Sequence, residues 1–339
     1  MAHTKGKLQI SVCVLGLAGM ALLVFLLRRA GAEAVAISIR AAGWGVVAVV
    51  AFHLVPLSCD AIAWGALFPE SERPTPFQLF WMRWMGESVS TLLPAAQVGG
   101  DIVRARLAAL KGAPLPTSAA SIVVDITLSI FAQAAFTIGG LTLFAKTTGR
   151  ISAVEILGGA IVAVAAIGGF YFVQRSGIFK IIGKLVSRLG SDTWKTLGAG
   201  GESLDKAIAT LYHRRGGIAV SATATMSSWI LGAGEVYIAM VALGLKASIA
   251  EALILESVSQ GIRAAMFLVP GALGFQEGGY VGVGAALGLP RETAMALALI
   301  RRVREVSFGL VGVIAWQMFE THRAWRIRSA SPSTPASAS

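Results

Sequence analysis

Two apolar stretches of this chain, 92–101 and 268–277, are each interrupted by a proline that is followed seven positions later by an acidic residue. Proline ends a helix, and unwound backbone at membrane depth is tolerated only where protein or a wet cavity surrounds it. Paired interruptions in two halves of one chain therefore predict a binding or translocation site between them. The residues expected to form these structural breaks are Pro94, Gly99, Gly100, Pro270, Gly271 and Gly274.

The composition fits a chain that lies mostly in lipid. Of 339 residues, 55% are hydrophobic and only 14% are charged, which is too little polar surface for a soluble globule. The net charge of +11 could suit nucleic acid, but the basic residues lie mostly in loops between apolar runs, where they favour cytoplasmic retention and contact with anionic headgroups. We therefore expect an all-α polytopic integral membrane protein with no nucleic-acid partner.

Long apolar runs predict about six full transmembrane helices. The first run is too long for the apolar core of a secretory signal, so we expect it to remain as a span. The predicted spans are about 8–27, 43–68, 117–145, 151–173, 218–243 and 292–318. Two re-entrant broken helical segments, 77–110 and 248–289, complete a predicted inverted repeat.

A basic segment, 175–217, divides the chain into a first membrane half, 1–174, and a second, 218–319. Eight Lys and Arg residues against three acidic ones, with apolar residues at helical spacing, predict an amphipathic cytoplasmic linker near the headgroups. Residues 320–339 are expected to form a basic and then disordered tail, because the last of them are only Ser, Ala, Pro and Thr. The basic linker and tail place both termini in the cytoplasm.

Charged residues inside spans cost roughly 2.5–3.5 kcal/mol each on insertion scales, so those present are expected to face a bundle interior or a cavity. The predicted substrate-binding residues are Arg83, Glu87, Asp101, Arg104, Arg106, Arg263, Glu277, Arg301, Arg304 and Glu305. Asp60, Asp125, Glu235 and Glu256 are candidates on the same ground. The alternative interpretation is that all these charges only pair with one another and lock the helices.

The run 301–305 concentrates three arginines and one glutamate. On a helix, Arg301 lies four residues and Arg302 three residues before Glu305, so one pair neutralises itself. The remaining arginines are then expected to stay available for an anion, such as the phosphate of a lipid head group.

Sequence signatures of catalysis and of cofactor binding are missing from the chain. The sequence has no Walker motif, no nucleophile elbow and no Asp-x-Asp element. The glycines of 271–288 follow no strand pattern, so they predict close helix packing and not a dinucleotide loop. His53 is the histidine within a predicted span, and it lacks metal-ligand spacing, so we interpret it as an ordinary buried histidine. We expect no metal and no cofactor.

The stretch 83–107, with RWMGESVSTLLP, QVGGD and RARL, resembles the first signature of the lysylphosphatidylglycerol synthase transmembrane-region (flippase-like) family. PGALGFQEGG at 270–279 and RRVRE at 301–305 resemble its second. Together with HLVPL at 53–57, they are most similar to the branch associated with hopanoid biosynthesis, the HpnL-type proteins. The likeness covers about residues 8–318.

This resemblance implies a bacterial inner-membrane protein that moves a lipid between leaflets. The expected partner is a membrane lipid, which could be a hopanoid, a phospholipid or a lipid-linked intermediate. About twenty residues follow the last predicted span, too few for the soluble aminoacyl-transferase domain of the lysyl-lipid synthases, so lipid aminoacylation is not expected.

Three functions therefore compete. The first is a translocator whose intramembrane arginines receive a polar head group while the tail stays in the bilayer. The second is an integral-membrane enzyme that modifies a hopanoid or polyprenyl lipid, with Glu87, Asp101 or Glu277 as acid or base. The third is a non-transporting scaffold whose basic linker recruits lipid-biosynthesis enzymes.

Overall fold

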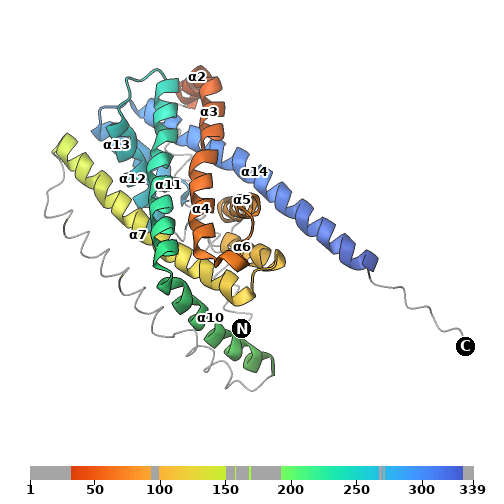
Figure 1. Ribbon diagram of the computed structural model, residues 1–339. Coiled ribbons are helices and arrows are strands. Elements are labelled where there is room, and N and C mark those ends of the chain that lie inside the picture. Colours follow the sequence, from red (N-terminus) through yellow and green to blue (C-terminus); the bar gives the residue numbers. More distant parts are fainter. Residues whose placement is uncertain are drawn as a thin grey trace, which may run out of the picture.

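The computed structural model describes residues 32–92, 99–149, 192–266 and 272–330, together with 157, 168 and 269. Every regular element within these residues is helical (Figure 1). In chain order the elements are α2 (Ala32–Ala42), α3 (Trp44–Phe52), α4 (Leu54–Leu67), the 3₁₀ turn η1 (Glu70–Glu72), α5 (Pro76–Leu92), α6 (Gly99–Leu110), α7 (Leu115–Thr148), α10 (Asp192–His213), α11 (Arg215–Ala242), α12 (Ile249–Ala265), α13 (Phe275–Ala286) and α14 (Arg291–Ala330).

The distribution of polarity is that of a membrane protein. Large apolar side chains are exposed on the outer faces of several helices, including Ile62 of α4, which is 58% exposed, and Ile314 of α14, which is 57% exposed. Charged side chains lie inside: Arg104 and Glu256 are each only 2% exposed. Apolar residues outside and ionic groups inside suit lipid as the surrounding solvent.

Three helical stretches are long and apolar enough to cross a bilayer. They are Trp44–Leu67, which joins α3 and α4, Leu115–Thr148 in α7 and Arg215–Ala242 in α11. The predicted spans 43–68, 117–145 and 218–243 fall on these stretches, and 292–318 falls within α14. The predicted spans 8–27 and 151–173 lie outside the described residues. The chain is thus a multi-pass membrane protein, while the full number of spans and the inverted repeat stay predictions.

A kink separates α3 from α4 at His53. Pro56 lies in the first turn of α4 and has no N–H to donate to the carbonyl of Phe52, so the ladder of hydrogen bonds is interrupted there. The carbonyl of Pro56 instead accepts a hydrogen bond from Ser228 Oγ of α11 at 3.0 Å. The interruption thus lies next to His53, which is only 7% exposed.

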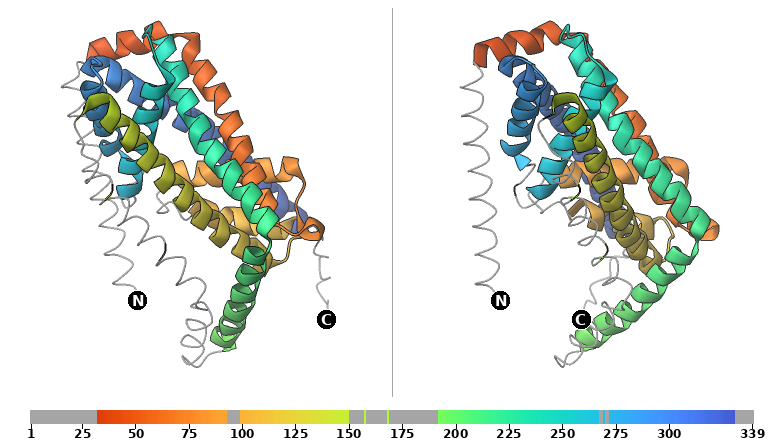
Figure 2. Two further views of the ribbon diagram at one scale, coloured as in Figure 1. Left: turned by 60° about the vertical axis from the view of Figure 1, so that its left-hand side comes forward. Right: turned by 90° about the vertical axis from the view of Figure 1, so that its left-hand side faces the viewer.

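The described residues of each predicted re-entrant segment form two helices. α5, apart from Pro76, and α6 fall within 77–110, and α12 and α13 fall within 248–289. Figure 2 shows from two further directions how these pairs sit among the long helices α7, α11 and α14.

The glycines predicted as breaks have different local roles. Pro94, Pro270 and Gly271 lie outside the described residues. Gly99 and Gly100 are the first two residues of α6, so they follow the first break, and Gly274 precedes α13 with a φ of 77°. A positive φ favours glycine, because a side chain would clash with the backbone there. Gly274 thus allows the chain to turn into α13.

Two segments differ from the sequence-based expectation. α10, in the second part of the predicted linker, packs against α7 and buries Ile208 and Leu211, each only 2% exposed, so this part of the linker belongs to the helical core. α14 continues to Ala330, so residues 320–330 are helical where we expected a tail. No Gly or Pro occurs between 320 and 330, so nothing in this stretch of the sequence interrupts the helix.

Candidate functional site

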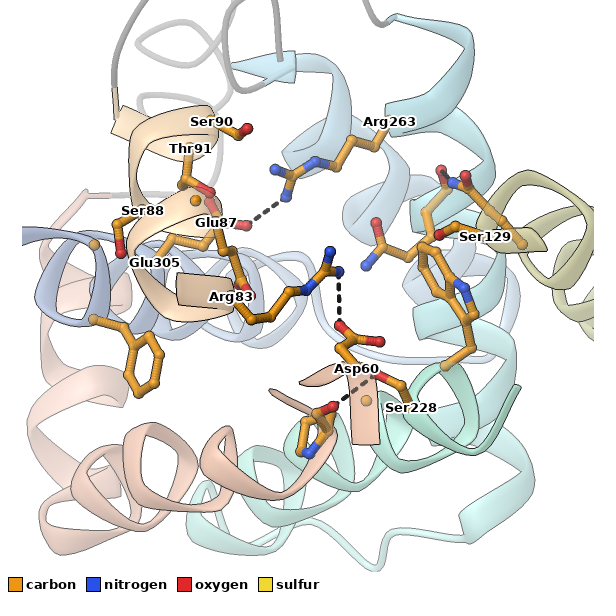
Figure 3. A pocket seen from close by; sticks show the side chains of 18 of the residues that line it. Asp60, Arg83, Glu87, Ser88, Ser90, Thr91, Ser129, Ser228, Arg263 and Glu305 are labelled. Atoms are coloured by element: carbon orange, nitrogen blue, oxygen red, sulfur yellow. Dashed lines mark hydrogen bonds and ion pairs between the residues drawn. The ribbon is translucent and has the colours of Figure 1, made fainter. Parts of the chain in front are cut away.

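A polar cavity of about 370 Å³ lies between the helices (Figure 3). Its wall contains side chains from α4, α5, α6, α7, α11, α12 and α14, and thus from both halves of the chain. The predicted substrate-binding residues that line it are Arg83, Glu87, Asp101, Arg104, Arg263, Arg301, Arg304 and Glu305. Asp60, Asp125, Glu235 and Glu256 line it as well.

Two of the predicted residues lie elsewhere. Arg106, whose side chain is 52% exposed, pairs with Glu320 of α14 at 3.0 Å, on the outside of the bundle. Glu277 is 1% exposed and is held away from the cavity, because Arg302 and the backbone N–H of Gly274 occupy its two oxygens. Neither residue is placed to meet a molecule in the cavity.

In the first half, five ionic side chains form a continuous cluster. Arg83 Nη2 donates to Asp60 at 2.9 Å, and its Nη1 reaches Asp125 of α7 at 3.5 Å. Arg104 of α6 donates to the same Asp125 at 2.8 Å and to Asp101 at 2.6 Å. Three carboxylates thus surround two arginines, which leaves this cluster with one surplus negative charge.

In the second half, Glu256 of α12 is the main partner of Arg301. It accepts from Arg301 Nη1, from the Tyr280 hydroxyl at 3.2 Å and from Gln260 Nε2 at 2.8 Å. The predicted helical pair of Arg301 with Glu305 is also present, with Nε to Oε1 at 3.5 Å. The sequence pattern found this local pair but not the partner on α12.

Arg302 and Arg263 complete this second cluster around Glu305. Arg302 Nε donates to Glu277 at 2.5 Å, while its Nη1 donates to Glu305 at 2.7 Å. Arg263 of α12 donates to the other oxygen of Glu305, also at 2.7 Å. The expectation that the arginines of 301–305 left over from the Glu305 pair would stay available for an anion is therefore not met. Arg301 binds Glu256 of α12, Arg302 binds Glu277 of α13 and Arg304 contacts Glu235 of α11.

Between the two clusters lies His53, which sequence reasoning missed as a site residue. Its Nδ1 is 2.8 Å from Glu235 Oε1 of α11, and its Nε2 is 3.0 Å from Glu87 Oε1 of α5. Arg304 Nη1 of α14 lies 3.1 Å from each ring nitrogen, and Phe308 packs edge-on against the ring. No sequence motif marks an isolated histidine in an apolar run. The free-energy cost of placing this polar side chain inside a membrane span was nevertheless a usable signal of a functional role.

Uncharged polar side chains also line the cavity. They are Ser129 and Gln133 of α7, Ser228 and Trp229 of α11, and Gln260 of α12. Hydroxyl and amide groups both donate and accept hydrogen bonds, and an indole face can cover an apolar part of a ligand. The cavity lining therefore combines ionic groups with neutral hydrogen-bonding groups.

The side chains that line the cavity can bind a ligand through hydrogen bonds and through their charges. Among the residues that the structure describes, no three His, Cys, Asp or Glu side chains are grouped so as to hold a metal ion.

Comparison with known proteins agrees with this picture. The model of the family described as the lysylphosphatidylglycerol synthase TM region matches residues 10–312. Neither the search of curated proteins nor the search of solved structures found a match. The matched region includes all the residues that line the cavity and most of the chain, so this protein belongs to the lysylphosphatidylglycerol synthase transmembrane-region family.

Proposed function

We propose that the protein is a flippase-like lipid translocator of the bacterial inner membrane, linked to hopanoid or other lipid metabolism, with both termini in the cytoplasm. The observation that carries this proposal is a polar, charged cavity inside a bundle whose outer surface is apolar. A head group enters the cavity while the hydrocarbon tail remains in the bilayer. Membership of a lipid-related membrane family supports the same direction.

The size of the cavity suits a head group. A volume of about 370 Å³ holds about twelve water molecules, at ~30 Å³ for each. That is enough for a compact polar group with its hydration, and too little for a whole lipid.

The charges of the cavity wall limit the net charge that the head group can carry. Seven carboxylates and five arginines line the cavity, and each of these arginines already contacts a carboxylate. An anionic head group would compete with these internal partners and meet the surplus negative charge. A neutral or zwitterionic head group can donate to the carboxylates and accept from spare arginine N–H groups. We therefore propose a head group of that kind, and not the anion that the sequence suggested.

Leaflet exchange in proteoliposomes tests the translocator. Purified protein is reconstituted with fluorescent phospholipids that differ in head-group charge, and the fraction of label accessible to an external quencher is followed. Ser129→Leu fills the cavity from α7 and should reduce exchange at least about tenfold. Phe131→Leu alters a side chain of the same helix that is 41% exposed on the outer surface, so exchange should be unchanged. Full exchange in folded Ser129→Leu protein would contradict the proposal.

Experiments with the same vesicles distinguish the two other candidate functions, an integral-membrane enzyme and a scaffold. Glu87 and Asp101 line the cavity with side chains 28% and 23% exposed, so an acid or base in an enzyme would be one of these. A lipid of new mass after incubation would favour the enzyme. A scaffold would show neither exchange nor a new mass.

A further inference from the structure

The contacts of His53 require a shared proton. Each ring nitrogen faces a carboxylate oxygen, at 2.8 Å for Glu235 and 3.0 Å for Glu87. An ionised carboxylate only accepts hydrogen bonds, and a neutral imidazole has a single N–H to donate. Two protons are therefore needed for both contacts, carried either by the imidazolium or by a neutral ring and one carboxyl group.

The proton also balances the local charge. With two protons, the three groups carry a net charge of −1, which Arg304 compensates through Nε at 3.2 Å from Glu235 Oε2. Without the second proton, His53, Glu87, Glu235 and Arg304 together carry a net charge of −1. A lone pair on a ring nitrogen then faces a lone pair on a carboxylate oxygen at hydrogen-bond distance. Such an unpaired buried contact is costly, so loss of the proton must open it.

Arg304 supplies a second arrangement for the deprotonated state. Its Nη1 lies 3.1 Å from both ring nitrogens and therefore over the ring, so a rotation of the Arg304 side chain would bring an N–H to the nitrogen that has lost its proton. The carboxylate that is then released is Glu87, because its side chain is 28% exposed to the cavity whereas that of Glu235 is only 7% exposed. One proton thus selects between two sets of contacts.

The position of these groups connects the proton to the helices of both halves. His53 stands at the kink between α3 and α4, Glu87 on α5 before the first break, Glu235 on α11 and Arg304 on α14. These are the charged groups that face the ring from the elements packed around it. Asp60, two turns further along α4, is held by Arg83.

We propose that His53 forms a proton-binding site with two carboxylates of the cavity wall, Glu87 and Glu235, and that the proton exchanged through Glu87 with cavity water is coupled to passage of the head group. The existence of the site stands on the geometry alone. The coupling rests on the proposed translocator function.

Histidine-selective ¹⁵N NMR of the full-length protein in detergent tests the site without any lipid substrate. The chain has four histidines, and loss of one signal in His53→Gln assigns the ring. Between pH 5 and pH 9, roughly the range in which histidine groups titrate, the wild-type ring should change its number of N–H protons. His213→Gln removes an exposed histidine and should leave this change unaltered.

Glu87→Gln is the decisive variant. The glutamine amide can donate to Nε2 while Nδ1–H donates to Glu235, so both contacts form with one proton fewer. The ring should then stay in the neutral Nδ1–H form over the whole range. A wild-type ring that keeps one neutral tautomer throughout, or a titration that is the same in Glu87→Gln, would overturn the site.

The coupling is measured in vesicles of phosphatidylethanolamine and phosphatidylglycerol with a fluorescent phospholipid. An imposed pH gradient should change the initial rate of leaflet exchange about threefold or more, and a protonophore should abolish the change. Exchange that ignores the gradient would overturn the coupling. If no exchange occurs under any condition while His53 titrates as expected, the translocator function fails and the proton site stands.

Discussion

Arg104 of α6 donates through Nη1 to Asp125 of α7 at 2.8 Å, and the two side chains are only 2% and 8% exposed. The other terminal nitrogen of Arg104 binds Asp101 at 2.6 Å, and the guanidinium carbon lies 5.1 Å from the centre of the Trp64 ring. The pair therefore joins the helix after the first break to a long span. A buried pair of this kind is a lock whose partners depend on each other.

Removing one partner should be far worse than removing both. Arg104→Ala leaves the buried Asp125 carboxylate with only the longer contact to Arg83, at 3.5 Å, so we expect a loss of about 3–5 kcal/mol in unfolding free energy. Arg104→Met combined with Asp125→Leu should recover most of that loss, since apolar residues of similar size replace the pair. The measurement is denaturant unfolding in detergent. A single variant as stable as wild type would show that the pair is hydrated.

The sequence predicted which charged residues line the cavity, but not how they pair. Charged residues in apolar runs identified every charged side chain of the cavity wall, because such residues are costly in lipid and are expected to face a cavity. The partner of each charge was beyond reach, because Arg304 and His53 are 251 residues apart in sequence, and Arg301 and Glu256 are 45 apart. Only the local pairs of Arg301 and Arg302 with Glu305, four and three residues apart on one helix, were predictable from spacing.

A methyl group at Gly100 should disrupt the packing of α5 against α6. A Cβ atom there would lie 1.9 Å from the carbonyl oxygen of Gly86 and 2.3 Å from Ser90 Oγ. Backbone cannot yield at such a distance, so Gly100→Ala should separate the two helices and sharply lower the amount of folded protein. Size-exclusion chromatography in detergent and thermal unfolding report this loss.

Gly139 of α7 provides the matched control, because a Cβ atom there would meet nothing within 4 Å. Gly139→Ala should leave folding intact or stabilise the protein by up to about 1 kcal/mol through helix propensity. If the two alanine variants behaved alike, the close approach of α5 and α6 would not be what requires glycine at position 100.

A lysine should be unable to replace the forked guanidinium group of Arg302. Its Nε and Nη1 bind carboxylates on two helices, at 2.5 Å for Glu277 and 2.7 Å for Glu305. A lysine ammonium is a point charge and cannot hold both in this geometry, so Arg302→Lys should cost about 1.5–3 kcal/mol of unfolding free energy, the worth of one charged hydrogen bond.

The same substitution on the surface is the control. Arg106 also pairs with a carboxylate, but its side chain is 52% exposed, so Arg106→Lys should change stability by no more than about 0.5 kcal/mol. Equal losses in the two lysine variants would mean that the fork of Arg302 adds nothing beyond charge. Both variants are compared by unfolding under one set of detergent conditions.

The two ends of α11 lie at opposite ends of the bundle. Arg214, just before α11, donates to the carbonyl of Leu67 at 2.8 Å, so the start of α11 and the end of α4 lie at one end of the bundle. The 28 residues of α11 extend about 42 Å, which exceeds a hydrocarbon core of about 30 Å. Lys246 is therefore at the opposite end from Thr210 of α10, as the course of α11 in Figure 1 also shows.

Single cysteines at these two positions should be labelled from opposite sides of the membrane. Because basic residues favour the cytoplasmic side, we expect Thr210→Cys to react with an impermeant maleimide only in inverted vesicles, and Lys246→Cys only in intact spheroplasts. Both are made in a chain without Cys13 and Cys59, and labelling after detergent solubilisation measures total accessibility. Labelling of both from one side would show that α11 does not cross, and would remove the predicted inverted repeat.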